Sequence, residues 1–340
     1  MSTHEIIKAG VIGAGRIGKI HTENLVTRIP GVQVAAIADV NLPAALDLAD
    51  KFNIPNAYAD YKKILEDPSI NVVAICSSTN THSDLIIEAA AAGKHIFCEK
   101  PVDHSLQRVD KAIEAVRKAG VSCQIGFNRR FDPNFKKVHE LVQDGKIGEL
   151  HILRITSRDP APPPVEYIKS SGGLFLDMTI HDFDMARYLS GDEVEEVYAV
   201  GGVMVDPKIG EAGDIDTAVI TLKFAHGAIG TIDNSRQSAY GYDQRVEVFG
   251  SAGMAAISNN TANSSIYSDA EGVHTEKPLY FFLERYMESF AAEMREFITA
   301  VREDKPTLVS VEDGRKPVVI AMAANKSMAE NRPVRLSEIE

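Results

Sequence analysis

A histidine and two aspartates recur at helical spacing in the second half of the chain. Asp177, His181 and Asp184 stand at positions i, i+4 and i+7, which places them on one stripe of a helix. An apolar stripe lies beside them and consists of Leu174, Met178, Met185 and Leu189. Polar groups at the margin of a buried face need a partner or a ligand, and an imidazole there can accept a proton near neutral pH. A structural Asp–His pair is the alternative, and a metal site is disfavoured because no third ligand with suitable spacing and no HExxH motif is present.

Lys100 is the second candidate for chemistry. It follows the apolar run at residues 96–98, which is typical of the end of a buried strand, and it stands between Glu99 and Pro101. In a parallel sheet, the carboxyl end of such a strand places the amine at the edge where open α/β folds bind ligands. The proline fixes the direction of the chain just after the lysine, which helps to aim the amine. A surface strand that stops at a proline is the alternative.

A glycine motif lies between a β-rich run at residues 6–12 and a helical stretch. It consists of Gly13, Ala14, Gly15, Arg16, Ile17 and Gly18. Gly13 permits a tight turn, Gly15 lets a pyrophosphate approach the backbone, and Gly18 lets helix and strand pack closely. The helix amino terminus offers free N–H groups and a partial positive charge to phosphates. The motif in this context predicts a dinucleotide site, although a glycine-rich turn without a ligand is the alternative.

Two further features indicate which dinucleotide binds. Asp39 follows the predicted strand Val32–Ala38 and lies 21 residues beyond Gly18. An acid there accepts hydrogen bonds from a ribose diol and repels a 2′-phosphate, which favours NAD over NADP. Arg16, a basic residue in the turn, could tolerate that phosphate and leaves the strictness of this preference open.

A polar loop at residues 77–82 follows another predicted strand and can bind the cofactor's ribose or carboxamide. Capping of the next helix by Asn80 or Thr81 is an alternative that is compatible with this role. Beyond the glycine motif, the predicted cofactor-binding residues are Asp39, Ser77, Thr79, Asn80, His82, Glu99 and Lys100.

The elements that position these residues change in pattern along the chain. Strands and helices alternate in the first third, which predicts a doubly wound parallel sheet of α/β type. After Arg130 the pattern becomes a meander of strands followed by two helices, which predicts an α+β half with a mainly antiparallel sheet. A chain of 340 residues is too long for one ordinary core. We therefore expect two domains, 1–125 and 126–340.

Composition excludes several classes of partner. The net charge is −12 and no basic run offsets it, which argues against nucleic acid. Cys76, Cys98 and Cys123 lie in apolar runs without a CxxC pair, so buried reduced thiols of a cytosolic protein are expected. Residues 1–8 contain no apolar core of signal-peptide length, and no stretch approaches the ~20 apolar residues that span a membrane. These features predict a cytoplasmic protein without a membrane partner.

Together the motifs resemble the Gfo/Idh/MocA oxidoreductases, and most closely the inositol 2-dehydrogenases among them. The resemblance covers essentially the whole chain and rests on residues 13–18, Glu99-Lys100-Pro101, 126–132, 157–162 and 177–184. It implies an N-terminal Rossmann domain for NAD and a C-terminal α+β domain that binds substrate. It also implies that a large open sheet supports homo-oligomers, usually tetramers, and that the bond between Lys100 and Pro101 is cis.

The resemblance further implies a catalytic set of Lys100, Asp177 and His181 that oxidises a ring carbinol with NAD. His181 would be the general base, Lys100 would stabilise alkoxide character, and Asp177 would orient the imidazole or bind a hydroxyl. Arg130 and Asp159 would join these three residues in the substrate site.

The implied reaction is oxidation of myo-inositol to its 2-keto product. One alternative is a dehydrogenase for scyllo-inositol or another cyclic polyol or sugar. A silent regulator that senses nucleotide or sugar is the other, but such a protein is expected to lose Lys100, His181 or both.

Overall fold

The computed structural model describes residues 6–339, which divide into two compact units. The first unit comprises the described residues up to Phe131 together with Glu288–Lys316. The second comprises Asp132–Met287 and the described residues from Pro317 onward. The expected single break at 125/126 differs from this division, because residues 288–316 return to the first unit. Met294, Phe297 and Ile298 explain the return, since they are part of that unit's hydrophobic core.

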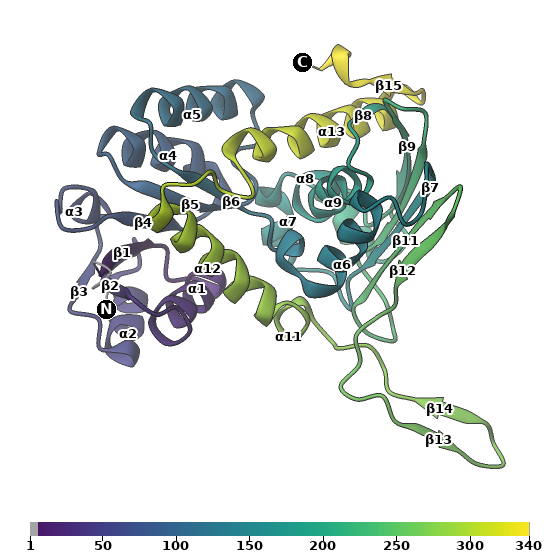
Figure 1. Cartoon of the computed structure of the whole chain (residues 1–340), viewed down its shortest axis with the longest axis horizontal. Coiled ribbons are helices and arrows are strands. Elements are labelled where there is room, and N and C mark those ends of the chain that lie inside the picture. The colour runs from purple at the N-terminus through teal and green to yellow at the C-terminus, as the bar shows by residue number, and fades with distance from the viewer. Residues whose placement is uncertain (1–5, 340) are drawn as a thin grey trace. The chain divides into compact units, whose positions relative to one another are not determined.

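The first unit contains a six-stranded parallel sheet in the order β3-β2-β1-β4-β5-β6 (Figure 1). Its strands are β1 (Ile7–Ile12), β2 (Val32–Ala38), β3 (Asn56–Tyr58), β4 (Val72–Ile75), β5 (His95–Glu99) and β6 (Cys123–Gly126). Its helices are α1 (Arg16–Thr27), α2 (Leu42–Phe52), α3 (Lys62–Leu65), α4 (His82–Ala91), α5 (Leu106–Ala119) and α12 (Met287–Glu303), with short 3₁₀ turns at Thr79–Thr81 and Asn128–Phe131. Strand order reverses between β1 and β4, the place where doubly wound sheets bind ligands. The predicted doubly wound sheet is thus confirmed.

The second unit contains a seven-stranded mixed sheet in the order β12-β11-β7-β10-β9-β8-β15. Its strands are β7 (Leu150–Arg158), β8 (Val194–Gly202), β9 (Thr217–Phe224), β10 (Ile229–Ser235), β11 (Asp243–Gly250), β12 (Gly253–Ile257) and β15 (Val334–Arg335), and a separate hairpin is formed by β13 (Ile266–Ser268) and β14 (Val273–Thr275). Its helices are α6 (Pro133–Gln143), α7 (Val165–Ser171), α8 (Leu174–Asp177), α9 (Ile180–Ser190), α10 (Pro207–Glu211) and α11 (Phe282–Arg285), while α13 (Val311–Glu330) is divided between the units at Pro317.

Only β7 and β10 pair in parallel within this sheet, so the predicted mainly antiparallel sheet is confirmed. Buried and exposed residues alternate along β9, as in an antiparallel sheet with one covered face. The predicted meander is incomplete, because β7 inserts between β10 and β11. The short strands β3, β12, β13, β14 and β15 were not predicted, since segments of two to five residues give little periodic signal.

The prediction that Asp177, His181 and Asp184 lie on one stripe of a single helix is wrong, because two helices share these residues. Helix α8 ends at Asp177 and α9 begins at Ile180. The interruption has a local cause, because the Thr179 N–H donates five residues back to Leu174 O at 3.0 Å, a wider turn than an α-helix allows. Asp184 is fully buried rather than at the margin of the buried face.

All three cysteines are free and buried, as predicted. Between residues 6 and 339, no helix has both the length and the apolar character needed to traverse a lipid bilayer.

Candidate active site

The glycine motif forms a cradle at the start of α1. Gly13 has φ of +106°, and a Cβ atom there would lie 2.5 Å from Cys76 O. A Cβ atom on Gly18 would lie 1.9 Å from Gly13 O, so neither position has room for a side chain. Nothing lies within 4 Å of a Cβ atom built on Gly15, which is the N-cap of α1. The backbone is therefore open where a pyrophosphate would meet the helix amino terminus, and these residues fit a dinucleotide.

Asp39 is fixed beside this cradle by two backbone hydrogen bonds. The Ala14 N–H donates to Asp39 Oδ2 at 2.7 Å, and the Asn41 N–H donates to Asp39 Oδ1 at 2.8 Å. Each carboxylate oxygen keeps acceptor capacity for a hydroxyl, because each can accept more than one hydrogen bond. The half-buried carboxylate is thus held in one place, and its contact with a ribose diol stays a prediction.

The polar loop after β4 is held mainly by its own side chains. Ser77 Oγ and Thr81 Oγ1 lie 2.7 Å apart, and Thr81 Oγ1 donates to Ser78 O at 2.7 Å. Thr81 occupies the N-cap of α4, but its side chain makes no cap hydrogen bond, so the capping alternative is not supported there. The loop lies at the carboxyl edge of the sheet as expected, and the cofactor roles of Ser77, Thr79 and Asn80 stay predictions.

His82 joins this loop to the segment that follows β5. The imidazole is buried, with Nδ1 2.8 Å from Pro101 O and Nε2 3.1 Å from Ser77 O. Burial lowers the pKa of His82, although both carbonyl contacts oppose the change. Because both ring nitrogens face backbone carbonyls, the side chain can shape the cofactor site by fixing two loops; direct contact with the cofactor stays a prediction.

Lys100 stands directly beyond β5, at the carboxyl end of a buried parallel strand. Its peptide bond to Pro101 is cis, as the resemblance implied. The chain is anchored again at Asp103, which accepts hydrogen bonds from Ser83 Oγ at 2.7 Å and Arg108 Nε at 2.8 Å. Burial alone would raise the pKa of Asp103, but these hydrogen bonds outweigh burial and lower it. The backbone on either side of the lysine is therefore held in place.

In the second unit, Asp177 belongs to an ionic network around the buried Arg236 that the sequence did not reveal. It accepts a hydrogen bond from Tyr167 Oη at 2.7 Å and one from Arg236 Nη1 at 3.1 Å. Arg236 is 1% exposed and also reaches Asp214, at 3.5 Å. These contacts hold the Asp177 carboxylate in one orientation. Arg236 follows β10 and belongs to no motif, so the sequence carries no local signal for it.

His181 is half-buried near the start of α9, and its neighbours in the chain are tied to the sheet. Thr179 Oγ1 donates to Asn234 Oδ1 at 2.6 Å, and Asn234 Nδ2 donates to Asp182 Oδ2 at 2.9 Å. One asparagine of β10 thus holds the side chains of residues on both sides of the histidine. Sequence reasoning missed Asn234, because its role depends on contacts more than 50 residues away.

The two remaining predicted substrate residues lie in different units. Arg130 belongs to the first unit, where its Nη2 lies 3.4 Å from Asp313 Oδ1. Asp159 belongs to the second unit and follows β7, and its N–H donates to Ser235 O at 2.9 Å. Their contact with substrate stays a prediction.

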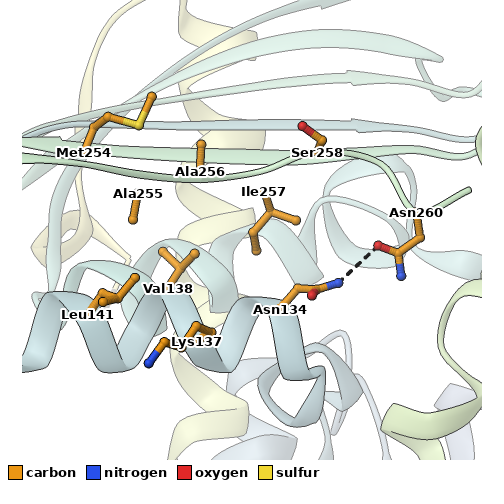
Figure 2. A pocket seen from close by; sticks show the side chains of 10 residues that line it. All are labelled: Asn134, Lys137, Val138, Leu141, Met254, Ala255, Ala256, Ile257, Ser258 and Asn260. Atoms are coloured by element: carbon orange, nitrogen blue, oxygen red, sulfur yellow. Dashed lines mark hydrogen bonds between the residues drawn. The ribbon is translucent and has the colours of Figure 1, made fainter. Parts of the chain in front are cut away.

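A groove of about 370 Å³ in the second unit lies between α6 and β12 (Figure 2). It is lined by Asn134, Lys137, Val138, Leu141, Met254, Ala255, Ala256, Ile257, Ser258 and Asn260. At one end Asn134 Nδ2 donates to Asn260 Oδ1 at 3.1 Å. None of the predicted site residues lines this groove.

Comparison with known families agrees with this geometry. Residues 7–127 match an oxidoreductase family with an NAD-binding Rossmann fold, and residues 135–256 match the GFO/IDH/MocA C-terminal domain. The chain belongs to the GFO/IDH/MocA oxidoreductase family. The predicted family and its NAD cofactor are thereby confirmed.

Individual GFO/IDH/MocA proteins match the chain over nearly its full length. A myo-inositol 2-dehydrogenase of Thermotoga maritima is 52% identical over 333 residues, covering 98% of this chain and 99% of the relative. An inositol 2-dehydrogenase of Rhizobium meliloti is 43% identical over 332 residues, covering 97% and 99%.

Solved structures of the family agree closely in fold. A probable dehydrogenase from Thermotoga maritima has a TM-score of 0.97 at 52% identity, covering 98% of this chain and 100% of the other. A scyllo-inositol dehydrogenase from Lactobacillus casei with bound NAD(H) and scyllo-inositol has a TM-score of 0.92 at 30% identity, covering 98% and 100%.

Proposed function

We propose that this protein is an NAD-dependent inositol 2-dehydrogenase that oxidises myo-inositol to 2-keto-myo-inositol. The observation that carries the proposal is the 52% identity to a myo-inositol 2-dehydrogenase over nearly the full length of both chains. The first unit binds NAD, and the second binds substrate and supports oligomers. We also place the protein in the cytoplasm, because three buried reduced cysteines suit a reducing compartment.

The proposed mechanism assigns one task to each catalytic side chain. The glycine cradle and Asp39 would hold NAD, which would supply the acceptor for the hydride of the carbinol carbon. His181 accepts the hydroxyl proton, since an imidazole is a good base near neutral pH. Lys100 stabilises the negative charge that develops on the same oxygen. Asp177, held by Tyr167 and Arg236, orients the imidazole or binds a neighbouring ring hydroxyl.

Binding groups complete the proposal. The cradle of Gly13, Gly15 and Gly18 receives the pyrophosphate, and Asp39 accepts hydrogen bonds from the adenosine ribose. Arg130 and Asp159 supply further polar contacts to the polyol. A cyclic polyol presents many donors and acceptors, so charged and polar side chains suit it better than an apolar pocket does.

A panel of inositols and sugars assayed with NAD and with NADP tests this function. We expect NADH to form fastest with myo-inositol, and NADP to be used poorly because Asp39 repels a 2′-phosphate. Rapid oxidation of scyllo-inositol together with negligible oxidation of myo-inositol would show that the protein is a scyllo-inositol dehydrogenase. The similarity to the scyllo-inositol dehydrogenase from Lactobacillus casei makes this the main alternative. The two inositols differ only in the orientation of one ring hydroxyl, so the same catalytic residues can serve either reaction, and the enzyme distinguishes them by where that hydroxyl finds a hydrogen-bond partner. No turnover of any polyol would indicate a regulator.

The exposed face of the seven-stranded sheet is the proposed contact with a second copy of this chain. Met254, Phe249, Ile152 and Ile229 stand opposite one another on neighbouring strands and form one row across the sheet. Three of the four are large exposed apolar residues, Met254 being 56% exposed. An apolar row of this kind on an open sheet marks an association surface. We expect light scattering to give the mass of a tetramer or a dimer, and a monomeric mass at assay concentration would contradict the proposal.

A further inference from the structure

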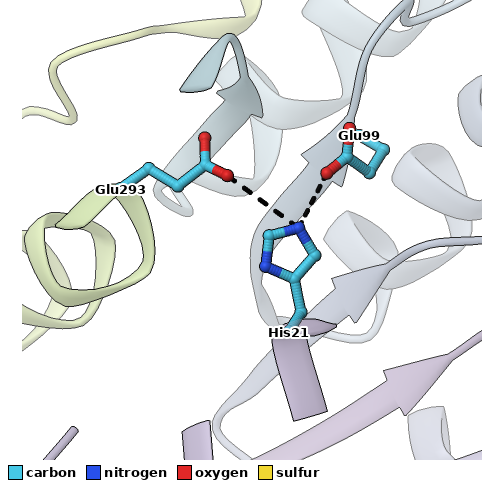
Figure 3. A group of neighbouring side chains, drawn as sticks. All are labelled: His21, Glu99 and Glu293. Carbon is cyan, nitrogen blue, oxygen red and sulfur yellow. Dashed lines mark hydrogen bonds and ion pairs between the residues drawn. The ribbon is translucent and has the colours of Figure 1, made fainter. Parts of the chain in front are cut away.

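A histidine and two glutamates meet in the interior of the first unit (Figure 3). His21 comes from α1, Glu99 ends β5, and Glu293 lies on α12. His21 Nε2 is 2.7 Å from Glu99 Oε1 and 3.9 Å from Glu293 Oε1. The side chains of His21 and Glu293 are 0% exposed, and that of Glu99 is 12% exposed. The proposed mechanism gives His21 and Glu293 no task.

The charge of this cluster follows from its burial. Neither carboxylate oxygen of Glu293 accepts a hydrogen bond from a described residue, which is costly for an ionised group. Burial, and then the Glu99 carboxylate, raise the pKa of Glu293 well above its ordinary value. The titratable groups that face Glu293 are His21 from α1, Glu99 from β5 and Cys76, which follows β4. When Glu293 is protonated, Glu99 is the one ionised carboxylate of the cluster, and it accepts the hydrogen bond from His21.

A bound cation is a poorer explanation of the same cluster. The ligand atoms of the three residues lie within 4.8 Å of one another. However, two ligand atoms on one tetrahedral zinc ion stand about 3.3 Å apart, because each bond is about 2 Å long. The contact of 2.7 Å between His21 and Glu99 is that of a hydrogen bond.

The cluster reaches Lys100 through the chain. Glu99 directly precedes the lysine, and its backbone pairs with Gly126 of β6. The Glu99 carboxylate fills the space beside that glycine, since a Cβ atom on Gly126 would lie 3.1 Å from Glu99 Oε2. On the other side of Lys100, Pro101 O is 2.8 Å from His82 Nδ1. Contacts with two buried histidines therefore flank the lysine.

We propose that His21 is a positioning residue for Lys100, acting through Glu99, and that Glu293 closes this cluster as a protonated, uncharged neighbour. The inference rests on the proposed function, because it concerns the aim of the lysine at the reacting oxygen. His21 also lies on the helix whose amino terminus is to receive the cofactor pyrophosphate. The hydrogen bond between His21 and Glu99 thus ties the cofactor helix to the strand that ends at Lys100.

The first test compares His21→Leu with His21→Gln. Leucine removes the donor to Glu99, and we expect kcat for myo-inositol to fall about 10- to 100-fold through misplacement of Lys100. Glutamine can still donate to Glu99, and we expect it to restore most of kcat. NADH affinity, measured by fluorescence titration, should change little in either variant. Gly126→Ala provides an independent perturbation, because its methyl group would shift the Glu99 carboxylate by a few tenths of an ångström without removing a polar group, and it should lower kcat less than His21→Leu does.

The second test detects the proton on Glu293 through the pH dependence of the protein's stability. Between pH 4.5 and the raised pKa of Glu293, the folded protein holds one proton more than the unfolded chain. The unfolding constant of the wild type should therefore rise about tenfold per pH unit relative to Glu293→Gln, since the amide does not titrate. Urea unfolding from pH 5 to pH 8 measures this difference. Glu293→Gln should also keep kcat close to that of the wild type, because the amide resembles a protonated carboxyl group.

Each outcome decides between the hypotheses. Absence of polyol oxidation by the wild type would overturn the proposed function and this inference with it. With an active wild type, equal losses of kcat in His21→Leu and His21→Gln, or no loss in either, would overturn the positioning role alone. Parallel pH dependences of the wild type and Glu293→Gln, or one divalent metal ion per chain by elemental analysis, would overturn the protonated state of Glu293.

Discussion

Replacing Lys100 with methionine is expected to lower kcat for myo-inositol oxidation by about 10²–10³-fold, the loss typical of removing one group that stabilises a developing oxyanion. Methionine keeps a chain of similar length and removes the positive charge together with the N–H donors of the amine. The anchors on either side of the lysine, His82 on Pro101 and the side-chain contacts of Asp103, do not involve the amine, so the fold should be retained. NADH affinity should be largely intact, because the glycine cradle and Asp39 are unchanged.

Steady-state kinetics and NADH fluorescence titration measure the two effects separately. Lys118→Met is a suitable control, since Lys118 is an exposed lysine near the end of α5 in the same unit. It should leave both kcat and NADH affinity unchanged. An unchanged kcat in Lys100→Met would remove this lysine from the chemistry.

Replacing His181 with glutamine is expected to reduce kcat by about 10²–10⁴-fold, the usual contribution of a general base. Glutamine can hydrogen-bond to the substrate hydroxyl but cannot accept its proton. The residual rate should rise with pH, because hydroxide then takes over the removal of that proton. The backbone should stay in place, since Thr179 and Asp182 remain bound to Asn234.

The pH–rate profile of the variant is the decisive measurement for His181. His226→Gln serves as the matched control, because His226 is an exposed histidine of the same unit whose Nδ1 lies 2.7 Å from Asp192 Oδ1. It should retain the wild-type profile. If His181→Gln kept the wild-type rate and profile, another group would have to be the base.

Short patterns predicted much of the fold because each depends on neighbours in the chain. The strand β1, the glycine cradle and α1 could be located from glycine spacing and hydrophobic periodicity alone. The position of Asp39 beside the cradle could be predicted in the same way, because the distance from glycine motif to acid is set by one helix and one strand. Lys100 was found as an amine at the end of a buried strand, and the parallel sheet places it as expected.

The break between α8 and α9 shows where such patterns fail. A run with helical spacing predicted one continuous stripe, but Thr179 bonds to Leu174 and to Asn234, and the helix is interrupted there. The contact with Asn234 links residues 55 positions apart. Such a contact cannot be predicted from the helical periodicity of a short segment.

The sequence by itself determined the nucleotide cradle, the parallel sheet and the types of the candidate catalytic groups, because local spacing and side-chain chemistry specify them. Only the tertiary structure decided what holds those groups. Arg236 contacts Asp177, which lies 59 positions away in the sequence. Glu293 lies near His21 because α12 packs into the hydrophobic core of the first unit. The physical reason is that burial and long-range hydrogen bonds depend on how distant segments pack, which no short stretch of sequence specifies.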